Sequence, residues 1–170
     1  GLSIYVGKTP NLLQKCGLDD LVMLINQAHL KNITAEKDIN AHKHGLTREQ
    51  VKQLPNELKH PVMIYDSISE KNKENSICVV TSLKDDEGNP IIAAIRANSN
   101  ESNKYLDITL KTVTTNNSNY ILSAYGKNNF IPFHLDEIID NNALLYANKE
   151  KTSKLISDSG LQLPTRYNSL

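Results

Sequence analysis

Residues 77–97 read ICVVTSLKDDEGNPIIAAIRA, and they hold the clearest β-sheet pattern in the chain. Two apolar runs, 77–83 and 90–97, flank the polar sequence 85–89, as the two strands of a hairpin flank their turn. Gly88 stands in that polar sequence, where a tight turn needs a positive φ. Because so short a connection joins antiparallel neighbours, this stretch predicts a β-hairpin at the centre of an antiparallel sheet.

Further strands are expected on both sides of this hairpin. Residues 62–67 precede it, and residues 105–115 and 120–125 follow it, each with a short apolar or alternating pattern. Residues 4–6 are a candidate for one more short strand. The linkers beside the hairpin are too short for the crossover that parallel neighbours need. The sequence therefore predicts a central antiparallel sheet of four to five strands.

Helices are expected before this sheet. Thr47 begins the clearest one, because Thr47 and Gln50 match a capping box, and Leu46 with Val51 matches the accompanying hydrophobic staple. A shorter helix is expected just before Gly17. Another is expected from residue 19, on the helical spacing of four apolar side chains, Leu21, Leu24, Ile25 and Ala28.

Helices are also expected after the sheet. Asn148 is the N-cap candidate of a last helix, which Gly160 would end. The helix before it is expected from the spacing of Phe130, Phe133, Ile138 and Ile139. Together these patterns predict one α+β domain over residues 1–170, with N-terminal helices, a central antiparallel sheet and C-terminal helices.

Charge and composition limit the function. The 170 residues include 19 basic and 19 acidic side chains, spread evenly along the chain. This balance argues against tight, sequence-independent binding of nucleic acid, but it allows a small phosphate pocket. The sequence contains neither an apolar run long enough for a membrane helix nor a signal-peptide pattern, so no membrane partner is expected. Cys16 and Cys78 stand in apolar contexts that predict buried free thiols.

Two segments without acidic residues are the first candidates for chemistry. Residues 39–48 contain His42 and His44, and residues 108–135 contain Lys127 and His134. The absence of nearby carboxylates keeps the local potential positive, which suits a bound phosphate. The alternative is chance combined with a Thr-rich strand. Gly-rich phosphate loops, nucleophile elbows and zinc-binding His-Glu-x-x-His sequences are absent from the chain.

Three histidines have open alternatives. His29 borders an apolar helix face, where it is either a structural histidine or a general base. His42 and His44 could form half of a metal site, but the sequence offers no third ligand. They are otherwise loop residues in solvent, or groups that contact a phosphate or act in catalysis.

Ser123, Tyr125 and Lys127 form the second candidate group. Strand alternation places Ser123 and Tyr125 on one face of the sheet, with Lys127 just beyond the strand. A hydroxyl, a phenol and an amine that converge there could bind a scissile phosphate. The alternative is an ordinary polar sheet face.

Short motifs along most of the chain resemble the C-terminal domain attached to phage MuF-like proteins. They include YVGKTP at 5–10, HGLT at 44–47, PVMIYDS at 61–67, GNPI at 88–91, SAYGK at 123–127 and GLQLP at 160–164. Such domains occur at the C-termini of prophage polymorphic toxins and large mobile-element proteins. Their order of helices and antiparallel sheet is similar to the barnase/EndoU/colicin/RelE superfamily of metal-independent ribonucleases.

This resemblance implies a toxin domain that hydrolyses RNA without metal or cofactor. His29 or His44 matches the helix-borne catalytic group of that superfamily, and Ser123, Tyr125 and Lys127 match its late-strand group. One histidine would take the 2′-OH proton, Lys127 would stabilise the phosphorane, and a second histidine or Tyr125 would protonate the leaving oxygen. The product would be a 2′,3′-cyclic phosphate. The extra C-terminal helices and the neutral net charge depart from the small basic nucleases of the superfamily.

Partners and location follow from the same resemblance. RNA is the expected substrate, and a dedicated immunity protein or the parent polypeptide is expected to restrain the domain. The bacterial cytoplasm is the expected site of action, with export as the C-terminal part of a larger toxin. Two alternatives stay open: a non-catalytic phage or mobile-element domain that binds a protein, and a toxin of another chemistry such as ADP-ribosyl transfer. The second is disfavoured by the lack of a nucleotide loop and of paired catalytic glutamates.

Overall fold

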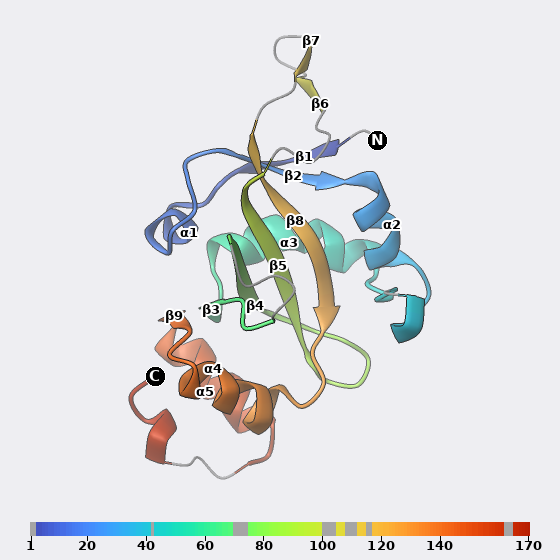
Figure 1. Ribbon diagram of the computed structural model, residues 1–170. Helices are drawn as coiled ribbons and strands as arrows, with labels where there is room; N and C mark the ends of the chain where they lie inside the picture. Colours follow the sequence, from blue (N-terminus) through green and yellow to red (C-terminus); the bar gives the residue numbers. More distant parts are fainter. Residues whose placement is uncertain are drawn as a thin grey trace.

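The computed structural model describes residues 3–41, 43–69, 75–99, 105–107, 112–114, 117–161 and 165–170. Within these ranges, seven strands form one sheet in the order β1-β2-β8-β5-β4-β3-β9 (Figure 1). They are β1 (Ser3–Lys8), β2 (Val22–Asn26), β3 (Met63–Asp66), β4 (Ser76–Lys84), β5 (Pro90–Ser99), β8 (Ser118–Gly126) and β9 (Leu144–Ala147). A separate pair contains β6 (Tyr105–Asp107) and β7 (Thr112–Thr114).

The helices lie between the strands along the chain. Those described are α1 (Asn11–Lys15), α2 (Gln27–Thr34), α3 (Arg48–Lys59), α4 (Leu135–Asp140) and α5 (Lys149–Asp158), with the further helical turns η1 (Ile39–Ala41), η2 (Phe130–His134) and η3 (Thr165–Tyr167). None of the helices in the described ranges is long and apolar enough to cross a bilayer.

The predicted fold class, an α+β domain with terminal helices around a four- to five-stranded antiparallel sheet, is wrong. The sheet has seven strands and is mixed, because β2 pairs with β8 in parallel, with Leu24 opposite Tyr120. Helices and strands also alternate along the chain instead of forming separate blocks. The sequence prediction failed because β2 pairs with β8 and β9 pairs with β3, strands that are distant in the sequence, and such pairing leaves little local signal.

The clearest local error concerns residues 22–26, which the apolar spacing assigned to a helix. They form the strand β2, with Met23 and Ile25 in one core cluster and Leu24 in another. A short apolar run buried on both sides fits a helix and a strand equally well. Pairing with β1 and β8 selects the strand, and α2 begins only after Asn26, whose side chain accepts a hydrogen bond from Ala28 N at 2.8 Å.

Residues 105–115 were also expected to belong to the central sheet. Instead, within the described residues, β6 and β7 pair only with each other, with Leu106 opposite Val113, and they project beyond the N-terminal end of β8 in Figure 1. Residues 108–111 and 115 of this range, with Lys111 among them, lie outside the described residues.

Two predictions with strong local signals are confirmed. β4 and β5 form the expected hairpin, with Val79 opposite Ala93, and Gly88 in its turn has φ +81°. Thr47 caps α3 through a complete capping box, in which Gln50 N donates to Thr47 Oγ1 at 3.1 Å and Thr47 N donates to Gln50 Oε1 at 3.0 Å.

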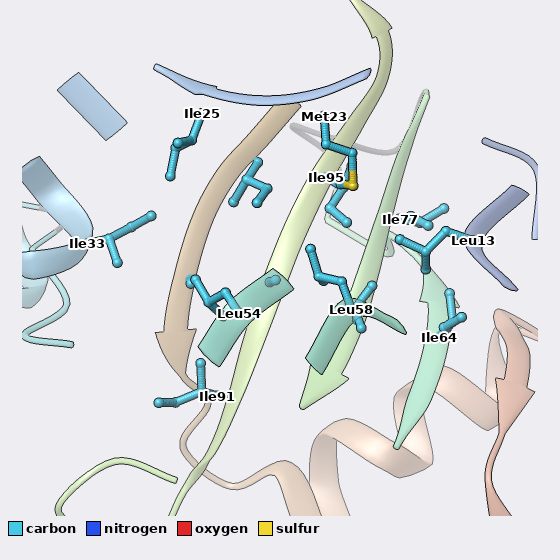
Figure 2. Packing of buried hydrophobic residues seen from close by; sticks show 14 of the residues in the cluster. Leu13, Met23, Ile25, Ile33, Leu54, Leu58, Ile64, Ile77, Ile91 and Ile95 are labelled. Atoms are coloured by element: carbon cyan, nitrogen blue, oxygen red, sulfur yellow. The ribbon is translucent and has the colours of Figure 1, made fainter. Parts of the chain in front are cut away.

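Different helices pack on the two faces of the sheet. On one face α1, α2 and α3 pack Leu13, Ile33, Leu54 and Leu58 against Ile64, Ile77, Ile91 and Ile95 of the strands (Figure 2). On the other face, α4 and α5 gather beside β3 and β9 and bury Leu135, Ile138 and Ile156 against Met63, Tyr65, Cys78, Val80 and Ile92. This second cluster continues to the partly buried Tyr125 at the end of β8, where a pocket opens.

Candidate functional site

A pocket of about 440 Å³ lies where the second face of the sheet meets the segment that follows β8. Its floor comes from three strands, which contribute Tyr65, Cys78 and Tyr125. Its walls come from the β3 end, the loop after β8, and the η2–α4 segment, which contribute Ser67, Ile68, Ser69, Lys127, Asn128, Asn129, Phe133, His134 and Glu137. The sheet therefore supplies hydroxyl and thiol groups, and the C-terminal segment supplies an amine, an imidazole and a carboxylate.

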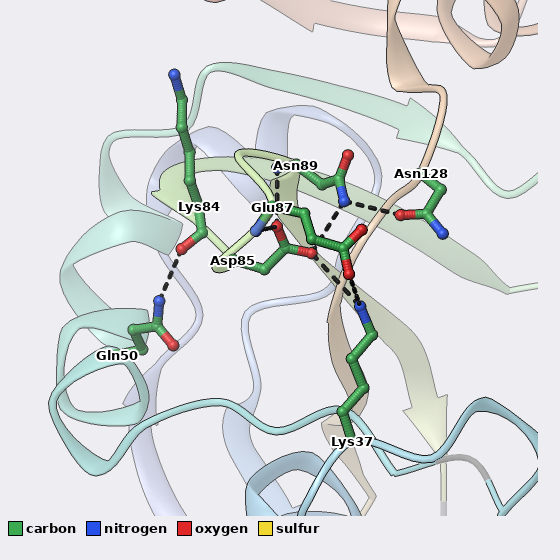
Figure 3. Close-up of polar contacts among 7 residues, drawn as sticks. All are labelled: Lys37, Gln50, Lys84, Asp85, Glu87, Asn89 and Asn128. Carbon is green, nitrogen blue, oxygen red and sulfur yellow. Dashed lines mark hydrogen bonds and ion pairs between the residues drawn. The ribbon is translucent and has the colours of Figure 1, made fainter.

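The loop that carries Lys127 is fastened to the β4–β5 turn. Lys127 N donates to Pro90 O at 3.0 Å. Figure 3 shows the second link, in which Asn89 Nδ2 donates to Asn128 Oδ1 at 2.7 Å. Asn89 is held in turn by Asp85, whose carboxylate accepts from Asn89 N at 2.8 Å and from Asn89 Nδ2 at 3.1 Å. The turn predicted at 85–89 thus also positions one wall of the pocket.

The packing of the Asp85 side chain against the β8 backbone requires glycine at position 126. A Cβ built at Gly126 would lie 2.1 Å from Asp85 Oδ2, far inside van der Waals contact. Lys37 Nζ also approaches this carboxylate, at 3.9 Å from Asp85 Oδ2, and lies 3.3 Å from Glu87 Oε1. The close approach of the Asp85 side chain to the β8 backbone therefore needs glycine at position 126.

His134 is the histidine of this pocket. Its Nε2 lies 3.0 Å from Tyr65 Oη, and its ring packs against the rings of Tyr65 and Phe130 at centroid distances of 5.5 and 5.6 Å. Its Nδ1 lies 3.9 Å from Glu137 Oε2. Burial, and then the nearby Lys127 ammonium, lower the pKa of His134 to about 4, against a smaller upward effect of Glu137. The imidazole is therefore neutral at pH 7 and has one nitrogen lone pair available to accept a proton.

The floor groups hold their protons. Burial raises the pKa of Tyr125 to about 12 and the pKa of Tyr65 well above its usual range. Burial also raises the pKa of Cys78 to about 11, although its hydrogen bond with Tyr65 and the Lys127 charge act in the opposite direction. At neutral pH these groups are hydrogen-bond donors, and the Cys78 thiol is a poor nucleophile.

The structure places some of the predicted site residues in this pocket and others outside it. Tyr125 and Lys127 line the pocket. His44 is not among the lining residues, but its ring contacts the Tyr125 ring at a centroid distance of 5.5 Å. Ser123 lies two residues before Tyr125 in β8, opposite Ala94 on β5, and is also outside the lining.

His29 occupies a different environment. It lies on α2, and burial followed by the charge of Arg96 lowers its pKa. Arg96 pairs with Tyr120 at the far end of β8 from Lys127. His42 lies outside the described residues, and within them no group of three or more His, Cys, Asp or Glu side chains could hold a metal ion.

Sequence reasoning missed the position of His134 in the pocket. The sequence contained one indication that His134 belongs near Lys127: both residues lie in the segment 108–135, which has no acidic residue. Its main partner, Tyr65, lies 69 residues earlier in the chain, however, so the pairing is visible only in the folded structure. Glu137 and Phe133 gave no separate signal, since both fell within an expected helix.

Residues 35–154 match the family model described as the phage MuF-C-terminal domain. The chain belongs to this family. The comparison with curated proteins and the comparison with solved structures gave no match. The MuF C-terminal match begins just after α2 and ends within α5, so it includes His44, Tyr125, Lys127 and His134 and leaves His29 outside. The expected resemblance to phage MuF-like proteins is thus confirmed, whereas the likeness to ribonucleases stays a prediction.

Proposed function

We propose that this MuF C-terminal domain is a toxin-type endoribonuclease that cleaves RNA without a metal ion. The observation that supports it is the convergence of the Lys127 ammonium, the neutral His134 imidazole and the protonated Tyr125 phenol in one pocket. A cation for the phosphate, a proton acceptor and a proton donor are the groups that intramolecular cleavage of RNA requires.

In this proposal His134 replaces His29 and His44 as the general base. The proposal requires the tautomer in which His134 Nε2–H donates to Tyr65 Oη, because the ring lone pair is then on Nδ1, the nitrogen nearer Glu137. A pKa of about 4 makes His134 a weak base in the free protein. A phosphate bound at Lys127 would offset the ammonium charge and raise this pKa, so that substrate binding itself would strengthen the base.

The proposed step is balanced within the substrate and three side chains. His134 Nδ1 takes the 2′-OH proton, the 2′-oxygen forms a bond to phosphorus, and the bond from phosphorus to the 5′-oxygen breaks. Tyr125 gives its proton to that 5′-oxygen, and Lys127 stabilises the phosphorane charge. The products are a 2′,3′-cyclic phosphate and a free 5′-hydroxyl.

Partners and location remain part of the proposal. A ribonuclease active in the bacterial cytoplasm harms the cell that makes it unless another surface covers the site. We therefore propose that an immunity protein, or the parent polypeptide of a larger exported toxin, covers the pocket around Lys127. The family match with a phage domain is consistent with a parent polypeptide of phage origin.

The direct test uses the purified chain and a fluorescent RNA oligonucleotide in EDTA. Cleavage should persist in the chelator and leave 2′,3′-cyclic phosphate ends. Lys127→Ala and His134→Ala should each lower kcat/KM by about a hundredfold or more, the usual contribution of acid–base and charge-stabilising groups. His44→Ala should cause a smaller loss, because His44 lies outside the pocket lining and its ring contacts that of Tyr125.

Two surface variants serve as controls. Lys52→Ala removes an exposed amine on α3 that pairs with Glu49, and His60→Ala removes an exposed imidazole at the end of the same helix. Both should cleave like the wild type. Absence of cleavage on every RNA tested, or cleavage that Lys127→Ala and His134→Ala leave unchanged, would contradict the proposal.

A further inference from the structure

Phe133 has an unusual exposure for a large apolar side chain. It is 67% exposed, whereas Phe130, three residues earlier, is 2% exposed. Phe133 also lines the pocket that contains Lys127 and His134. A single exposed hydrophobic residue needs no explanation, but an exposed aromatic ring at the rim of a charged pocket offers a flat surface to a ligand.

The backbone that carries Phe133 is well anchored. On one side Phe130 is buried in the second cluster, and on the other side Leu135 is fully buried. His134 N donates to Asn129 O at 3.0 Å, which closes the turn around Phe133. The ring is therefore displayed from a fixed support, so that little conformational freedom is lost when a ligand packs against it.

The surroundings of the ring are polar. Asn128 and Asn129 line the same rim, and their amides can both donate and accept hydrogen bonds, as the edges of nucleobases require. Lys127 supplies the positive charge next to them, and Glu137 adds one carboxylate on the α4 side. An aromatic face beside a cation and amides is the combination that single-stranded nucleic acid uses, with one base stacked and its phosphate paired.

We propose that Phe133 is the platform on which one unpaired base of the RNA substrate stacks, next to the phosphate held by Lys127. This inference rests on the proposed ribonuclease function and adds a substrate class to it, single-stranded RNA. A base inside a duplex already has neighbours on both faces and is unavailable to the ring. Unpaired loops and ends should therefore be cleaved, and duplex RNA should be spared.

The test compares Phe133→Ala with Phe133→Tyr, which keeps an aromatic face. On a single-stranded oligonucleotide, Phe133→Ala should lower kcat/KM by roughly five- to hundredfold, the range that base stacking on an aromatic side chain provides, and Phe133→Tyr should retain most of it. Leu161→Ala, at a side chain that is 43% exposed on the turn after α5, is the control and should act like the wild type. The wild type should cleave the same sequence much more slowly as a duplex.

A binding measurement separates this inference from the ribonuclease function. A 2′-O-methyl oligonucleotide that carries 2-aminopurine cannot be cleaved, and the fluorescence of its base changes on stacking. Wild type and Phe133→Tyr should shift this fluorescence, and Phe133→Ala should not. If the wild type cleaves RNA but Phe133→Ala matches it in both assays, or if duplex is cleaved as fast as single strands, the stacking platform is refuted while the ribonuclease stands. If Phe133→Ala weakens binding of a protein partner and not of RNA, the ring is a protein contact and the inference is likewise refuted.

Discussion

At the scale of single residues, Gly126 has no room for a Cβ beside Asp85. Gly126→Ala should force the Asp85 carboxylate away, because the new methyl would lie 2.1 Å from Asp85 Oδ2. The expected loss of stability is about 1–3 kcal/mol, as for other overpacked sites. The proposed RNA cleavage should also fall, since Asp85 holds Asn89 and thereby the Lys127 loop. Urea unfolding measures the stability of Gly126→Ala, Asp85→Ala and the double variant. The double variant should lose less free energy of unfolding than the two single variants lose together, and strict additivity would contradict this steric coupling.

At the scale of elements, α3 depends on its capping box. Thr47→Ala removes the acceptor of Gln50 N and should lower stability by about 1 kcal/mol, whereas Thr47→Ser should keep the hydrogen bond and most of the stability. The proposed RNA cleavage, measured well below the unfolding temperature, should be unchanged in both, because α3 packs on the sheet face opposite the pocket. Chemical unfolding with a kinetic assay checks both statements, and equal stability of the Ala and Ser variants would show that the cap contributes nothing.

At the scale of the whole molecule, His134 should make folding stability depend on pH. Its pKa is about 4 in the folded protein and near the usual 6.5 in the unfolded chain, so between these values the unfolded chain binds more protons. Stability should therefore fall as pH is lowered from 6.5 to 4, by up to about 3 kcal/mol from this group. His134→Gln should lose less stability over the same window than the wild type. Parallel urea titrations at pH 7 and pH 4.5 measure the difference, and identical pH slopes would contradict it.

The zero net charge of the molecule bears on its proposed partner. Any electrostatic attraction of an acidic immunity protein has to be local to the pocket, and it should weaken as salt screens it. Lys127→Ala should raise the Kd of that complex. Lys151→Ala should not, since Lys151 Nζ donates to His60 O and does not line the pocket. Equal affinity of both variants, measured by titration calorimetry at two salt concentrations, would favour a contact centred elsewhere.

The sequence by itself determined the features that depend on neighbours a few residues apart. The hairpin at 77–97, the cap at Thr47 and the cap at Asn148, which accepts from Lys151 N at 2.9 Å, all follow from local chemistry and are present. Strand alternation grouped Ser123 and Tyr125 on one face with Lys127 just beyond, and of these three residues Tyr125 and Lys127 line the pocket. Short-range hydrogen bonds and side-chain spacing suffice for these features, because their partners are close along the chain.

Only the tertiary structure decided the rest. Residues 22–26 are a strand because β1 and β8 flank them, and β9 exists because β3 offers it an edge. The pocket likewise arises from contacts between distant segments, with His134 meeting Tyr65 from β3 and Lys127 held by the β4–β5 turn. His29 and His44 carried the expected chemical groups but lie outside the pocket lining. A short apolar run or a lone histidine is compatible with several environments, and the burial and pairing that select one of them exist only once the sheet has formed.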